Sequence, residues 1–111
     1  MTVSQLIDAL EMKLLTKGTD ISREIKGGCV CDLLSLVMAN GTEGMAWITV
    51  QSHLNVVAVA SLHDFACVIV CDGCEVDADT VAKAEEEGIT VLSSALSGYE
   101  IAGRMYEKGV K

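Results

Sequence analysis

One pattern recurs through the second half of the chain: a short apolar run, a turn, and then a helical segment. The apolar runs cover residues 46–50, 67–71 and 89–92 and are rich in β-branched side chains. Trp47, Val68 and Thr90 mark them at intervals of 21 and 22 residues, the length of one strand, loop and helix. Apolar runs without alternation are typical of strands buried on both faces. The pattern predicts an α/β fold, a three-layer arrangement of a mostly parallel sheet flanked by helices.

Helices are expected after each of these strands. The segment 55–64 is the most apolar of them. Asp77 and Ser97 are expected to cap the two later helices, because short oxygen-bearing side chains satisfy free amides at helix N-termini. Gly88 and Gly109 are expected to end those helices.

The first 45 residues are less regular. A helix, a strand and a second helix are expected over residues 2–10, 12–15 and 32–40. Thr2 and Gln5 form a capping box for the first helix, and Asp32 is expected to cap the second. The segment 20–30 is ambiguous, with short extended pieces around Gly27 and Gly28.

Length and composition favour one domain over residues 1–111. The chain has no linker-like or low-complexity segment, and half of its residues are apolar. Sixteen acidic against eight basic residues give a net charge of -8, and the basic residues are scattered. That charge argues against nucleic acid and anionic membranes as partners. No apolar run is long enough to span a membrane, and the N-terminus lacks the basic start of a targeting segment.

Five cysteines make an odd number, which argues against a disulfide scaffold and favours a reducing cytoplasm. Cys71 and Cys74 form a Cys-x-x-Cys pair. A thioredoxin-like use is excluded, because the next helix begins only at Asp77 and the chain has no proline for the cis-Pro that such sites need. With Cys29 and Cys31 the pair could supply four thiolates to a metal ion. A metal-binding or redox protein is therefore an alternative, although free cysteines also serve as small core residues.

Ligands of open parallel sheets bind at the carboxyl ends of the strands, where helix N-termini point. Small, hydroxyl-bearing and polar residues occupy these positions and would suit a small polar or anionic ligand. The candidate ligand-binding residues are Ser52, His53, Asn55, Asp72, Gly73, Ser93 and Ser94. The competing interpretation is that serine, aspartate and glycine are the ordinary residues of turns and caps.

The histidines differ in expected role. His53 lies at the expected ligand edge, where it would be a hydrogen-bond or charge partner, whereas His63 is expected to face solvent near a helix C-terminus. No nucleophile elbow, metalloprotease motif or P-loop is present. We therefore expect no catalytic residues, no cofactor and no enzymatic activity.

Three segments, residues 47–60, 68–77 and 88–94, resemble the DRTGG domain, and residues 24–28 and 32–35 extend the resemblance. Such domains occur beside CBS pairs and in the middle of phosphotransacetylases, and they are similar in fold to the N-terminal domain of HPr kinase/phosphorylase. The resemblance implies a parallel α/β module that dimerises and has a regulatory, often ligand-linked role.

The signature residues of that family are mostly replaced. Where the family has Asp-Arg, this chain has Ser52 and His53, and Cys71-Asp72-Gly73 stands in place of Thr-Gly-Gly. Without the arginine, the ligand edge lacks the side chain best suited to bidentate binding of a phosphate.

The leading hypothesis is a stand-alone regulatory or ligand-binding module, acting as a homodimer on a small anionic or nucleotide-like ligand. The first alternative is the cysteine-based metal or redox protein. The second is an interaction subunit that binds a protein partner without a small ligand. On that hypothesis the apolar face of the 55–64 helix, with Val56, Val57, Val59 and Ala60, builds an oligomer interface.

Overall fold

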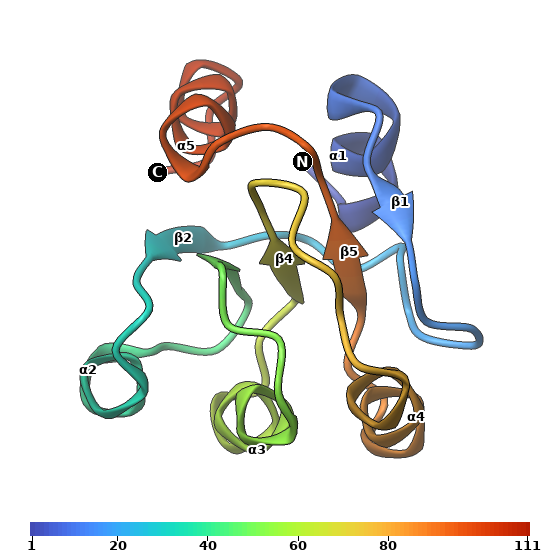
Figure 1. Cartoon of the computed structure of the whole chain (residues 1–111). Coiled ribbons are helices and arrows are strands. Elements are labelled where there is room, and N and C mark those ends of the chain that lie inside the picture. The colour runs from blue at the N-terminus through green and yellow to red at the C-terminus, as the bar shows by residue number, and fades with distance from the viewer.

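The computed structural model describes residues 1–111, which form one five-stranded sheet with helices on both faces (Figure 1). The strands are β1 (Lys13–Leu14), β2 (Gly27–Val30), β3 (Met45–Thr49), β4 (Cys67–Val70) and β5 (Val91–Ser93). The helices are α1 (Val3–Leu10), α2 (Leu34–Asn40), α3 (Leu54–His63), α4 (Ala78–Glu87) and α5 (Gly98–Glu107). The strand order is β1-β5-β4-β3-β2, and every neighbouring pair is parallel except β1 and β5. The expected α/β fold class is confirmed.

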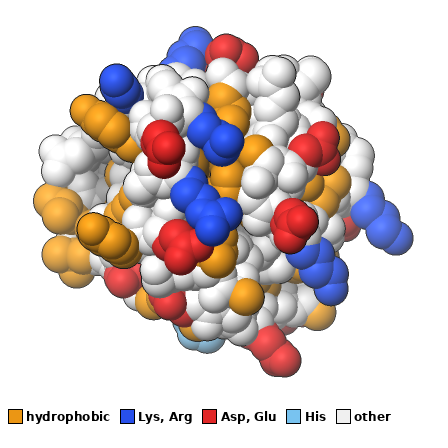
Figure 2. Space-filling view, turned by 90° about the horizontal axis from the view of Figure 1, so that it is seen from above, with side chains coloured by type: hydrophobic (Ala, Val, Ile, Leu, Met, Phe, Trp, Pro, Cys, Tyr) orange, Lys and Arg blue, Asp and Glu red, His pale blue; other side chains and the backbone are white.

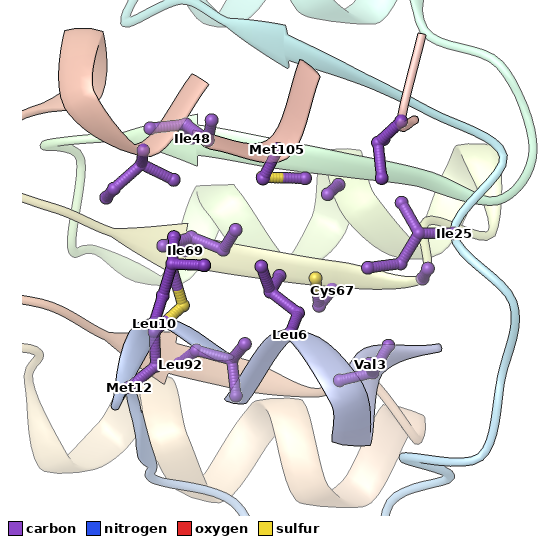
Figure 3. Packing of buried hydrophobic residues seen from close by; sticks show 14 of the residues in the cluster. Val3, Leu6, Leu10, Met12, Ile25, Ile48, Cys67, Ile69, Leu92 and Met105 are labelled. Carbon is purple, nitrogen blue, oxygen red and sulfur yellow. The ribbon is translucent and has the colours of Figure 1, made fainter. Parts of the chain in front are cut away.

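Helices α2, α3 and α4 cover one face of the sheet, and α1 and α5 cover the other (Figure 1). The central strands supply both cores because their residues alternate between the two faces. On β4, Cys67 and Ile69 pack into the α1/α5 core, shown in Figure 3, whereas Val68 and Val70 pack beneath α2 to α4. Burial on both faces explains why these strands form continuous apolar runs in the sequence.

Local signals in the sequence are confirmed at two helix starts. Thr2 and Gln5 form the reciprocal capping box of α1, and the Ser97 hydroxyl accepts the amide of Glu100 in α5. The ambiguous segment contains β2, which pairs in parallel with β3 from Gly27 opposite Met45. The strand expected over 12–15 is confirmed as β1.

The Asp32 and Asp77 side chains do not make the capping hydrogen bonds that the sequence predicted. Leu33 is the N-cap residue of α2, and no side chain caps that helix. The Asp32 carboxylate instead accepts the Thr49 hydroxyl at 2.8 Å and the Val50 amide at 2.9 Å. Asp77 does occupy the N-cap position of α4, but its carboxylate makes no capping bond. Both carboxylates are engaged by the end of β3 and the loop after it.

The apolar face of α3 is not an oligomer interface, as the interaction-subunit hypothesis supposed. Val56, Val57, Val59 and Ala60 are all buried in the protein's own core against Trp47 and Phe65. His63 is more engaged than expected for a solvent-facing residue, since its Nε2 lies 2.6 Å from the carbonyl oxygen of Met38 and its ring stacks on Phe65. None of the helices combines the length and the apolar character that crossing a membrane requires.

Candidate functional site

The loops after β4 and β5 leave the sheet in opposite directions. The chain passes from β4 into α4 on one face, and from β5 into α5 on the other (Figure 1). The two strands are parallel neighbours, so both loops begin at the same edge of the sheet. A crevice opens where adjacent loops diverge in this way, and open α/β sheets bind their ligands there.

A cleft of about 500 Å³ lies at this point of divergence. Three segments line it: the stretch around β1, the β4–α4 loop with the first turns of α4, and the end of β5. The lining residues are Glu11, Lys13, Leu15, Gly73, Cys74, Glu75, Val76, Val81, Ser93, Ser94 and Ala95. The volume falls in the range of small-molecule sites.

The two loops that border the cleft are hydrogen-bonded to each other. The amide of Asp72 donates to the Leu96 carbonyl and the amide of Gly73 to the Ser94 carbonyl, each at 2.9 Å. Asp72 and Gly73 both adopt left-handed backbone angles, with φ of 59° and 68°, which makes the turn tight. The amide of Cys74 donates back to the Cys71 carbonyl at 3.2 Å. These three amides are therefore occupied and cannot cradle a phosphate.

Other groups in the cleft are available to a ligand. The backbone amides of Glu75, Val76 and Ala95 donate to no acceptor in the protein. The hydroxyl of Ser94 accepts the Leu96 amide at 3.1 Å and still has a proton to donate. The side chain of Ser93 lies directly across the strand pair from Lys13.

The charges of the cleft are mixed. Lys13 is its one basic residue, and Glu11 and Glu75 are its acidic residues. A polyphosphate would bring several negative charges next to these two carboxylates, with a single cation to offset them. The cleft is better suited to a polar ligand that carries little negative charge.

The predicted ligand-binding residues divide into two groups. Gly73, Ser93 and Ser94 line the cleft, whereas Ser52, His53, Asn55 and Asp72 do not. The second group comes after β3 in the chain, apart from Asp72, which is exposed on the turn that borders the cleft.

Residues after β3 are tied to the start of α4. His53 Nδ1 lies 2.9 Å from a carboxylate oxygen of Asp77, and the Thr80 hydroxyl donates to the Ser52 carbonyl at 2.9 Å. Both His53 and Asn55 are exposed. The sequence predicted that all these residues lie together at the carboxyl edge of the sheet. The cleft occupies only the part of this edge near β4 and β5, so the residues after β3 lie outside it.

Sequence reasoning missed the β1 side of the cleft. Glu11, Lys13 and Leu15 reach the site because β1 pairs with β5 in antiparallel fashion, although about 80 residues separate them along the chain. No local feature of the sequence predicts that β1 pairs with β5. The exposed Lys13 beside a short apolar stretch was the available hint, since edge strands carry lysines.

The cysteines do not form a metal centre. No group of three or more His, Cys, Asp or Glu side chains is arranged to hold a metal ion. Cys71 packs into the α1/α5 core, whereas Cys29, Cys31 and Cys74 pack against the core on the opposite face of the sheet. The structure thus does not gather the four thiols that the alternative hypothesis required.

Burial also keeps the strand thiols protonated. Desolvation raises the pKa of Cys29 to about 11 and that of Cys67 to about 12. Burial, together with the neighbouring Asp72 carboxylate, raises the pKa of Cys71 to about 11. All five cysteines are free. A thiol with such a pKa is a poor nucleophile and metal ligand at neutral pH.

The fold has a counterpart of known structure. No family model matches the sequence, and no curated protein matches it. The fold is similar to a crystal structure of the CBS and DRTGG domains of the regulatory region of Clostridium perfringens pyrophosphatase, complexed with its activator, diadenosine tetraphosphate. The TM-score is 0.69 at 14% sequence identity, covering 92% of this chain and 44% of that chain. The fold is DRTGG-like, as the sequence resemblance implied.

Proposed function

We propose that this DRTGG-like chain is a regulatory module without catalytic activity, which binds a small polar ligand and acts as a homodimer. The observation that carries the ligand part is the cleft of about 500 Å³ at the divergence of the β4 and β5 loops. This is the position where open α/β sheets bind ligands. The fold is shared with part of a pyrophosphatase regulatory region that binds a nucleotide activator, which supports the regulatory part.

The chemistry of the cleft supports binding rather than catalysis. Its hydroxyls, on Ser93 and Ser94, have no imidazole beside them in the lining, and the His53–Asp77 pair lies outside it. A serine without an adjacent base is a weak nucleophile. The cleft residues can bind and orient a ligand through hydroxyls, free amides and one lysine.

The ligand that we propose is nucleotide-like or another small anion of low charge. A nucleoside or mononucleotide is of a size that fits the cleft. Lys13 can neutralise one phosphate, whereas Glu11 and Glu75 oppose a chain of them. We therefore expect the chain to bind adenosine or its monophosphate more tightly than diadenosine tetraphosphate.

The module that we propose is a single domain of the cytoplasm, spanning residues 1–111. Its five free thiols fit a reducing compartment. A homodimer is the arrangement that the family resemblance implies.

Isothermal titration with a ligand panel tests the ligand part. The panel contains adenosine, its mono- and triphosphates, diadenosine tetraphosphate and acetyl phosphate. The informative variant is Ala95→Trp, because Ala95 is exposed and lines the cleft, so an indole fills the space without entering the core. Ala58→Trp is the matched control, since Ala58 is exposed on α3 away from the cleft.

We expect the unmodified chain to bind at least one panel member and Ala95→Trp to weaken that binding by at least about tenfold. Ala58→Trp should bind as the unmodified chain does. Equal affinity of Ala95→Trp and the unmodified chain would place the ligand elsewhere and overturn the assignment of the cleft. Failure of the folded chain to bind any panel member would overturn the proposed ligand class.

A further inference from the structure

Strand β2 forms an open edge of the sheet. It pairs with β3 on one side and with nothing on the other. Its sequence, Gly-Gly-Cys-Val, contains no charge and no proline. Proteins normally protect such an edge with a charged side chain, a proline, a bulge or a covering segment, because its free N–H and C=O groups can pair with another chain.

Apolar side chains surround this edge. Val30 on the strand is 55% exposed, and Leu33, Leu36 and Met38 in and before α2 are 61%, 48% and 46% exposed. Leu33 and Leu36 share one flank of α2, whereas Met38 lies on the flank toward α3. We call Val30, Leu33 and Leu36, together with strand β2, the β2 surface. Figure 2 shows hydrophobic side chains gathered at the left margin of the molecule, the side on which Figure 1 places β2 and α2. Clustered exposed apolar side chains mark interaction sites more reliably than single ones.

Two hollows flank β2. One, of about 230 Å³, lies between β2 and α2 and includes Leu36 and Met45 in its lining. The other, of about 290 Å³, lies between β2 and α5 and includes Met105 and Tyr106. Cys29 and Val30 line both hollows. A partner strand laid along β2 would therefore cover apolar recesses on both sides of its backbone.

The charge distribution indicates what kind of partner fits. The chain carries a net charge of -8, yet residues 27–41 contain a single charged residue, Asp32. One oxygen of that carboxylate already accepts the Thr49 hydroxyl and the Val50 amide. A basic partner would find almost no counter-charge here. Two copies of this chain, each with a net charge of -8, repel each other less when they meet through this nearly uncharged surface than when they meet through charged ones.

We infer that a second copy of this chain docks on the β2 surface, with the two β2 strands antiparallel across a two-fold axis. Such an isologous contact joins the two sheets into one and places α2 of each protomer beside α2 of its partner. Helix α2 contains no charged residue, so Leu36, which lines the hollow beside β2, can contact the partner's α2 without burying a charge. This inference rests on the proposed homodimer and adds the surface that forms it.

Sedimentation equilibrium of three proteins tests the inference: the unmodified chain, Val30→Lys and Leu62→Lys. Each variant adds one lysine at an exposed apolar position, and circular dichroism checks that both remain folded. Leu62, 65% exposed at the end of α3, is the matched control. We expect the unmodified chain and Leu62→Lys to sediment at twice 11.7 kDa. Val30→Lys should weaken self-association by about a hundredfold, because each dimer would hold two like charges at its centre.

The outcomes separate this inference from the proposal on which it rests. A dimer that survives Val30→Lys overturns the β2 surface and leaves the homodimer standing. A dimer lost equally in Leu62→Lys also overturns the assignment of the surface. A monomeric unmodified chain overturns both the dimer and its surface, including the case in which β2 binds a different protein. The cleft is tested independently of all three results by Ala95→Trp.

Discussion

The two edges of the sheet differ in length, charge and surroundings. At one edge β1 is two residues long, antiparallel to its neighbour, and carries the exposed Lys13, which lines the cleft together with Glu11. At the other edge β2 is four residues long, parallel to its neighbour and free of charge, with exposed apolar side chains beside it. The β1 edge thus presents a polar cleft of ligand size, and the β2 edge presents an apolar border with a hollow on each side.

The segment after β1 is bonded to the rest of the protein through side chains. The Thr16 hydroxyl accepts the Val91 amide at 3.2 Å, and the Lys17 amide donates to a carboxylate oxygen of Glu85 at 2.7 Å. The chain after β1 is thereby bonded to β5 and to α4. After β2, by contrast, Cys31 donates its amide inward to the Ile48 carbonyl, and the apolar residues beyond it stay exposed. The two edges thus differ in strand length, in strand direction and in the side chains beside them.

The largest expected effect comes from replacing Trp47, whose side chain is bonded to the segment after β2. Trp47 is fully buried, packs edge-on against Phe65 with ring centroids 6.0 Å apart, and donates its indole N–H to the Cys31 carbonyl at 2.8 Å. We expect Trp47→Ala to lower the free energy of unfolding by about 3–5 kcal/mol, measured by urea denaturation. Trp47→Phe keeps most of the volume and should lose about 1–2 kcal/mol. Equal losses in the two variants would show that volume is not what Trp47 contributes.

The second prediction concerns pH and Cys67, which lies on the central strand β4. Burial raises the pKa of Cys67 from 9.0 to about 12. The unfolded chain therefore releases this proton at lower pH than the folded chain does. The contribution to stability is complete below pH 9 and is lost as the pH rises toward 12, by up to about 1.4 kcal/mol for each pH unit.

Urea denaturation at neutral and at alkaline pH measures this loss. Cys67→Ala removes the titrating group, so its free energy of unfolding should fall less between the two conditions than that of the unmodified chain. Lysine deprotonation affects both proteins equally and cancels in the difference. Parallel pH profiles for the two proteins would contradict a raised pKa at Cys67.

The third prediction tests the hydrogen bond between Thr16, in the segment after β1, and Val91 of β5. Thr16 is 1% exposed, and Thr16→Val keeps its shape while removing the oxygen that accepts the Val91 amide. An unpaired buried amide should lower the free energy of unfolding by about 1–3 kcal/mol. Thr19→Val is the control, because Thr19 can bond to Thr16 but reaches no backbone amide. A loss in Thr19→Val as large as that in Thr16→Val would show that the Val91 amide is not the reason.

The sequence predicted those parts of the fold that depend on local signals. The β-branched runs indicated β3, β4 and β5 because burial on both faces leaves a continuous apolar pattern. The Thr2 box marked α1 correctly because the cap and the amide it satisfies are three residues apart. Asp77 was correctly placed at the N-cap of α4, whereas Leu33 and not Asp32 is the N-cap of α2. Neither carboxylate makes a capping bond, because each bonds to a residue distant in the chain, Thr49 or His53.

The candidate site was predicted only in part, because local signals reveal some of its residues and long-range strand pairing brings in the others. Gly73, Ser93 and Ser94 come directly after parallel strands or end them, so the rule for carboxyl ends was enough to propose them. Lys13 and Glu11 enter the cleft through the long-range pairing of β1 with β5, which no periodicity encodes. The β2 edge was equally hidden, because its two glycines give a weak strand signal and β2 depends on pairing with β3.

The smallest expected change in stability is that of Lys13→Glu, which tests whether β1 serves ligand binding and β2 serves self-association. Lys13 is exposed on β1 and has no ion-pair partner, so Lys13→Glu should change the free energy of unfolding by no more than about 0.5 kcal/mol. Its mass in sedimentation should equal that of the unmodified chain, because β1 takes no part in the proposed dimer. Its affinity for a phosphate-bearing panel member should fall by about tenfold, while affinity for uncharged adenosine stays constant. Val30→Lys should do the reverse, weakening the dimer and leaving the cleft intact. If Lys13→Glu instead disturbs self-association, the β1 edge is part of the interface and the two edges do not divide ligand and partner between them.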